Sequence, residues 1–127
     1  MRGFARLSAA VPASGVADFE RNTTNTLALW RQADADGSAL VVFPELGLSG
    51  YSTRDLLHDT HLLETSKACL LELASAGRDL VPVAIVGLPL RVGSGLYNVA
   101  AAIHGGRVLA VVPKAYLPNY REFEETR

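Results

Sequence analysis

The chain has 127 residues, of which 49% are hydrophobic, and carries 12 Lys and Arg against 13 Asp and Glu. This length fits one domain, since domains usually run to about 100–200 residues. The apolar fraction is high enough to fill a core, which excludes an intrinsically disordered chain. The net charge of −1 is too balanced for the positive surface that a dedicated nucleic-acid binder needs.

The single cysteine and the N-terminal segment bear on the cellular compartment. One cysteine cannot form an internal disulfide, so nothing indicates an oxidising compartment. The N-terminus lacks the apolar stretch of a signal peptide. The most apolar segment, residues 81–90, contains Pro82, Gly87 and Pro89 and is half of the roughly 20 residues that span a bilayer. We therefore expect a cytoplasmic protein without a membrane partner.

The first half of the chain predicts two strands around one helix. Residues 4–11 alternate loosely between apolar and small side chains up to Pro12, which predicts a strand. Asp18 is a candidate N-cap of a helix that ends at Gly37. The expected apolar face of this helix consists of Phe19, Leu27, Trp30 and Ala33. Residues 39–43 are an uninterrupted apolar run, which is typical of a strand buried on both faces of a helix-covered sheet.

The second half predicts one more helix and three strands. A helix over residues 61–76 would end at Gly77 and would place five residues on one stripe, namely Leu62, Ser66, Cys69, Leu70 and Leu73. Strands are expected at 83–88, 97–103 and 108–112, with glycine-containing turns between them. The tail, residues 116–127, is polar and aromatic and shows no strand pattern.

This order of elements predicts an α/β fold with a mixed sheet, parallel at first and antiparallel later. The two helices are long enough to cover one face of that sheet. No helix follows the last expected strand, so the other face or an edge would remain uncovered. The sequence therefore indicates an incomplete domain.

One pattern occurs twice: an apolar strand, then proline, then a charged residue. It places Glu45 after Pro44 and Lys114 after Pro113. If both strands end at the same rim of the sheet, the carboxylate and the ammonium lie where open α/β sheets build their sites. The alternative is that proline simply ends each strand and that both charges are solvated.

The strings around these two residues resemble the nitrilase, or carbon-nitrogen hydrolase, superfamily. Residues 43–51, FPELGLSGY, are similar to its first catalytic segment, and residues 113–118, PKAYLP, to its second. With residues 87–90 and 96–98, the longer string 113–125 is most similar to the N-terminal glutamine amidotransferase domains of glutamine-dependent NAD synthetases. The resemblance implies an αββα sandwich with helices on the outer face. Residues 1–127 would be its N-terminal part, with no second domain.

The family uses a Glu, Lys and Cys triad, in which the cysteine attacks the substrate amide. The resemblance assigns Glu45 as general base and Lys114 as the group that stabilises the tetrahedral oxyanion. Both roles are chemically reasonable, because a nearby carboxylate can accept the thiol proton and a fixed ammonium stabilises developing negative charge.

Three residues of the tail receive further roles from the resemblance. Glu125 falls near the auxiliary catalytic glutamate, Tyr120 matches a glutamine-binding tyrosine, and Phe123 would line the same pocket. Alternatives stay open: Tyr120 as an ordinary loop aromatic, and Glu125 as a surface charge interchangeable with Glu122 and Glu124.

The nucleophile is where this sequence departs from the family. The family cysteine follows a later strand, downstream of the lysine, and this sequence ends at Arg127 before reaching it. Cys69 is expected to be structural, because it lies on the apolar stripe of a helix. His58 and His61 lack a third metal ligand, and the turn at residues 93–95 lacks the remaining features of a nucleotide-binding loop. No metal or cofactor site is expected within this chain.

The resemblance implies a parent that hydrolyses glutamine and passes the ammonia to a synthetase domain, which converts deamido-NAD to NAD with ATP and Mg²⁺. The implied partners are glutamine and that synthetase domain, and a homo-oligomer is expected. One alternative is a stand-alone nitrilase-like amidase or carbamoylase. Another is a catalytically dead fragment that binds a partner or serves as a scaffold. In either the glutaminase or the scaffold interpretation, the 127 residues alone are expected to be inactive.

Overall fold

A mixed five-stranded sheet forms the centre of the chain. The computed structural model describes residues 3–15, 17–50, 60–113, 119–120 and 123–124. The strands follow in the spatial order β1 (Leu7–Ala9), β2 (Leu40–Val42), β3 (Val83–Val92), β4 (Gly95–His104) and β5 (Arg107–Pro113). Strands β1, β2 and β3 are parallel, whereas β3, β4 and β5 pair antiparallel. The predicted change from parallel to antiparallel pairing is confirmed.

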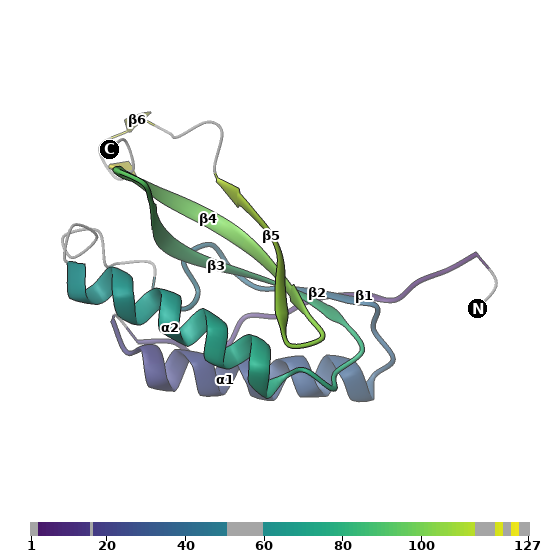
Figure 1. Ribbon diagram of the computed structural model, residues 1–127. Helices are drawn as coiled ribbons and strands as arrows, with labels where there is room; N and C mark the ends of the chain where they lie inside the picture. The colour runs from purple at the N-terminus through teal and green to yellow at the C-terminus, as the bar shows by residue number, and fades with distance from the viewer. Residues whose placement is uncertain (1–2, 16, 51–59, 114–118, 121–122, 125–127) are drawn as a thin grey trace.

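Two helices, α1 (Phe19–Ala35) and α2 (Thr60–Ala76), lie side by side on one face of the sheet (Figure 1). Helix α1 begins where predicted, because the Asp18 side chain accepts a hydrogen bond from the backbone N–H of Arg21 at 3.2 Å. It ends before Gly37, whose φ of +78° is readily adopted only by glycine. Neither α1 nor α2 combines the length and the apolar character that crossing a bilayer would require.

The core lies between the helices and the sheet face that they cover, which we call the helix face. Alternate strand residues point into it and are almost fully buried: Val41, Ala84, Val86, Ala101 and Ile103. The whole predicted stripe of α2 is buried against this face. Helix α1 adds Trp30, which is fully buried and donates its indole N–H to the carbonyl oxygen of Pro82 at 2.9 Å. Two polar residues of α1, Asn22 and Thr26, are also buried, which the apolar pattern did not predict.

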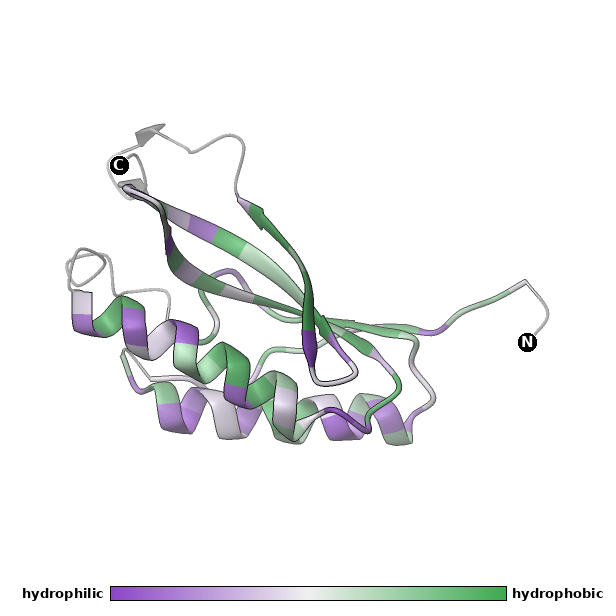
Figure 2. Cartoon of the chain, in the orientation of Figure 1, coloured by the Kyte–Doolittle hydropathy of each residue, from purple (hydrophilic) through white to green (hydrophobic). Residues whose placement is uncertain are grey.

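The opposite side of the sheet, the open face, is not covered by any helix within the described ranges. Val42 on β2 is 41% exposed and Val112 on β5 is 61% exposed there. The prediction that residues 39–43 are buried on both faces is therefore wrong for this chain. This exposure agrees instead with the other expectation, drawn from the lack of a helix after the last strand, that one face or an edge of the sheet is uncovered. Figure 2 shows that the strands are mostly hydrophobic, whereas hydrophobic and hydrophilic residues alternate along both helices.

The remaining differences from the sequence prediction concern element boundaries. The first strand pairs only over Leu7–Ala9, whereas β3 and β4 extend to a tight turn at Gly93 and Ser94. In this longer hairpin Pro89 lies opposite Asn98, so the proline does not end the strand. In the tail, β6 (Asn119–Tyr120) pairs antiparallel with β7 (Phe123–Glu124). Two-residue strands are too short to produce a recognisable alternation.

Candidate active site

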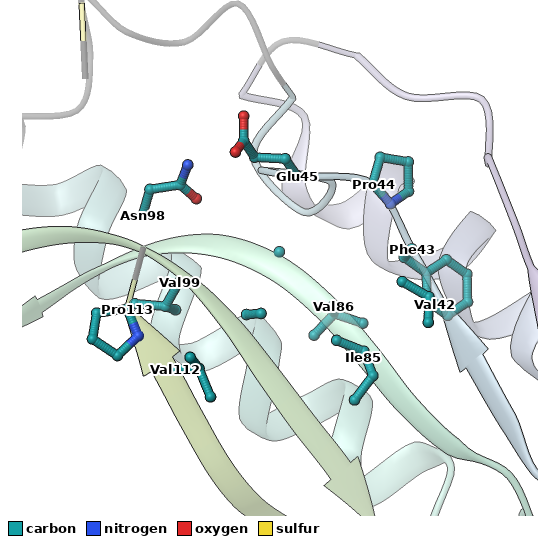
Figure 3. A pocket seen from close by; sticks show the side chains of 12 residues that line it. Val42, Phe43, Pro44, Glu45, Ile85, Val86, Asn98, Val99, Val112 and Pro113 are labelled. Carbon is teal, nitrogen blue, oxygen red and sulfur yellow. The ribbon is translucent and has the colours of Figure 1, made fainter. Parts of the chain in front are cut away.

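A cavity of about 330 Å³ lies on the open face, beyond the carboxyl end of β2 (Figure 3). Its lining comes from β2, β3, β4 and β5 and from the turn after β2. Most of these residues are apolar or small, including Val42, Ile85, Ala100 and Val112. Glu45 and Asn98 are the two polar side chains among the described lining residues, and both project to the same side of the strands. An apolar pocket with a few polar groups is the usual form of a small-molecule site.

The strand directions explain why Glu45 and the end of β5 meet at this cavity. Strand β2 is parallel to β3, and both β3 and β5 are antiparallel to β4, so β2 and β5 run in the same direction. Their carboxyl ends therefore reach the same rim. Glu45 and Pro113 both line the cavity. Lys114 follows Pro113 directly but lies outside the described residues, so a shared cleft for Glu45 and Lys114 stays a prediction.

The turn that carries Glu45 runs against the backbone of β3. The N–H of Gly47 donates to the carbonyl of Pro44 at 3.1 Å, and the N–H of Leu48 donates to the carbonyl of Gly87 at 3.1 Å. A Cβ atom at position 87 would lie 2.6 Å from the backbone nitrogen of Leu46 and 2.7 Å from the carbonyl oxygen of Pro44. Position 87 therefore requires glycine, because only a residue without a side chain permits this approach.

The other predicted site residues lie in the tail. Tyr120 in β6 pairs with Phe123 in β7, which brings their backbones together. Glu125, like Lys114, falls outside the described residues. The structure thus brings Glu45 to a cavity, whereas the roles of Lys114, Glu125, Tyr120 and Phe123 remain predictions.

Asn98 is a cavity residue that the sequence reasoning did not assign to the site. It lies on β4, where most of the other residues are apolar or small, and its side chain is half-buried. A single amide inside such a strand was the available signal. Within the described ranges, no three His, Cys, Asp or Glu residues gather closely enough to hold a metal ion.

Cys69 lies on the side of the sheet away from the cavity. As predicted, it belongs to the buried stripe of α2. Burial raises the pKa of its thiol; the Thr23 side chain lowers the pKa in part and the negative charge of Glu72 raises it, and the net change is upward. Since the thiolate is the nucleophilic form, this environment opposes a catalytic role.

Substitution of Cys69 by alanine should therefore leave the glutaminase activity that the family resemblance implies for a longer parent protein nearly unchanged. We expect a loss of about 1–2 kcal/mol in the free energy of unfolding, because a small buried side chain is removed from the helix packing. Steady-state kinetics and denaturant unfolding measure the two effects. A folded Cys69→Ala protein without glutaminase activity would contradict this assignment.

Two comparisons with known proteins, one with a family model and one with single relatives, agree with each other. The family model for carbon-nitrogen hydrolases matches residues 7–126. The glutamine-dependent NAD(+) synthetase of Mycobacterium bovis is 47% identical over 125 residues, which is 98% of this chain and 18% of that protein. The chain thus spans less than a fifth of this relative's length.

Solved structures extend the comparison to the fold. A glutamine-dependent NAD(+) synthetase from Cytophaga hutchinsonii matches 91% of this chain and 20% of its own, with a TM-score of 0.84 and 27% identity. An amidase from Nesterenkonia sp. matches 94% of this chain and 46% of its own, with a TM-score of 0.75. At 20% identity the second likeness concerns the fold alone. The predicted nitrilase-type fold, present here in part, is confirmed.

Proposed function

The chain belongs to the carbon-nitrogen hydrolase family, and on that basis we propose that it is the N-terminal part of a glutaminase domain. Residues 1–127 would form this part without a second domain. The parent would hydrolyse the side-chain amide of glutamine and supply the ammonia for synthesis of NAD from deamido-NAD. The observation that carries the proposal is Glu45 at an open-face cavity, in a chain 47% identical to a glutamine-dependent NAD(+) synthetase.

In the proposed reaction Glu45 acts as general base for a cysteine thiol that the rest of the parent supplies. The sulfur attacks the amide carbon of glutamine, and the ammonium of Lys114 stabilises the oxyanion that forms. Collapse of this intermediate breaks the C–N bond, and Glu45 returns the proton to the departing ammonia. Water then hydrolyses the thioester to glutamate and regenerates the thiol.

The cavity chemistry supports this division of roles. A carboxylate near apolar Val42, Ile85 and Val112 would have few competing water molecules once substrate fills the space. We propose that Tyr120 and Phe123 contact glutamine and that Glu125 assists Glu45, as the family resemblance implies.

We place ATP and Mg²⁺ in the synthetase domain of the parent, which is also the proposed partner of this chain. The glutaminase steps proposed above use only the carboxylate, the ammonium and the thiol. Glutamine as substrate and a homo-oligomeric parent belong to the same proposal.

The experiment compares two nitrogen donors in the full-length protein. With deamido-NAD, ATP and Mg²⁺ present, we expect NAD formation from either glutamine or ammonium chloride. NAD formation from neither donor, together with hydrolysis of simple amides, would favour a stand-alone amidase and overturn the proposal. Activity with ammonia but not with glutamine would overturn the glutaminase role alone.

A further inference from the structure

Helix α1 holds the Glu45 turn through one buried side chain, Asn22. This residue is fully buried. Its amide nitrogen donates to the carbonyl oxygen of Leu48 at 2.9 Å and to that of Gly15 at 2.8 Å. Its amide oxygen accepts a hydrogen bond from the N–H of Gly15 at 2.8 Å. Both kinds of hydrogen-bonding group in the carboxamide are therefore used, which a purely apolar helix face would not require.

The opposite side of the same turn is held by β3. Leu48 donates its N–H to the carbonyl of Gly87 and accepts from Asn22 at its own carbonyl, so one residue links the turn to both the sheet and the helix. The segment before α1 adds a third connection, because the N–H of Ala17 donates to the carbonyl of Ser49 at 2.7 Å. The turn is thus fixed at two consecutive residues, Leu48 and Ser49, which are the third and fourth residues after Glu45.

The backbone of the turn needs such external support. Leu46, the residue after Glu45, has a φ of +52°, a left-handed conformation that is strained for a residue other than glycine. A turn with this strain relaxes unless surrounding contacts hold it. The direction of the Glu45 side chain depends on this backbone, because the two residues are adjacent.

We propose that Asn22 is a positioning residue for Glu45 in the glutaminase reaction, acting through Leu48 and the turn without touching substrate. This inference rests on the proposed function, in which a carboxylate oxygen of Glu45 must lie within about 2.6–3.2 Å of the sulfur or nitrogen atom with which it exchanges the proton. A displacement of about 1 Å at a reacting group can cost about 100-fold in rate.

The substitution that tests this is Asn22→Asp in the full-length protein. Aspartate has the same shape and retains an acceptor for the Gly15 N–H, but it removes both donated hydrogen bonds and places a carboxylate oxygen against the carbonyl of Leu48. The matched control is Asn25→Asp, one turn along the same helix. Asn25 donates to the carbonyl of Ala13 at 2.7 Å, and this hydrogen bond does not involve the turn.

Two measurements are made on each protein. We expect Asn22→Asp to lower the glutamine-dependent kcat about 10- to 100-fold, with KM changed less than about threefold and ammonia-dependent synthesis preserved. Hydrogen exchange at the amides of Leu48 and Gly50 should accelerate about tenfold or more, because both N–H groups are hydrogen-bonded in the intact turn. Asn25→Asp should leave the kinetics and the exchange of these amides close to wild type.

The outcomes separate this inference from the proposed function. Unchanged exchange in the turn, or accelerated exchange with an unchanged kcat, would overturn the positioning role. A wild-type protein that cannot use glutamine would overturn the proposed function, whereas the exchange comparison would still decide whether Asn22 holds the turn. If Asn22→Asp does not fold, Asn22→Ser replaces it, since it shortens the side chain away from Leu48 without adding charge.

Discussion

Replacing Glu45 with glutamine in the proposed full-length synthetase should reduce glutamine-dependent NAD synthesis by about 10²- to 10⁴-fold, the range that general acid–base catalysis contributes. Glutamine has nearly the same size as glutamate, so the turn and the cavity should persist. Its amide cannot accept the thiol proton or return it to the leaving ammonia. Synthesis from ammonium chloride should proceed at the wild-type rate, because free ammonia bypasses the glutaminase step.

The control for this prediction is Glu64→Gln on α2. It makes the same chemical change at an exposed glutamate in the helix layer, which does not line the cavity. Both donors should support synthesis at wild-type rates in this variant. Equal use of glutamine by the Glu45→Gln and Glu64→Gln proteins would remove Glu45 from the mechanism.

Much of the fold was predictable because its signals are local. The Asp18 cap, the stop at Gly37 and the buried stripe of α2 each depend on residues within a few turns of one another. The apolar run at residues 39–43 does not by itself reveal that Val42 is exposed, but the lack of a helix after the last expected strand predicted an uncovered face, and this exposure agrees with that prediction. The β6–β7 pair was missed because two residues provide no periodicity.

The candidate site divides in the same way. The repeated strand, proline and charge pattern predicted that Glu45 and Lys114 share a rim, and Glu45 does line a cavity together with Pro113. The supports of the turn were not predictable. The bond from Asn22 to Leu48 spans 26 positions of sequence, and the requirement for glycine at position 87 arises only when the turn lies against β3. Such contacts depend on tertiary structure and leave no local pattern.

The 127-residue chain expressed alone should release no ammonia from glutamine above background. Its one cysteine is buried on the helix face, so no thiolate is available at the cavity. Glu45 and Lys114 would then have to activate water against an unstrained amide, without the covalent intermediate that divides the reaction into two easier steps. A coupled assay for glutamate formation measures this directly, with the full-length protein as positive control.

The isolated chain should also self-associate, because apolar side chains are exposed on its open face. Val42 and Val112 are exposed there, and Leu109 and Val111 are 52% and 40% exposed elsewhere on β5, an edge strand of the five-stranded sheet. A contiguous apolar surface larger than a few hundred Å² is unusual on a soluble monomer, and an edge strand adds unpaired backbone groups that can pair with another chain.

We expect light scattering to show dimers or larger species, with their population falling on dilution. Val112→Lys together with Val42→Thr should shift the distribution toward monomer, because both changes add polarity on the open face while the helix-face core is untouched. An isolated wild-type chain that stays monomeric at high concentration would mean that the open face needs no cover. If that monomer also hydrolysed glutamine at an enzymatic rate, the proposal that another part of the parent supplies the nucleophile would be wrong as well.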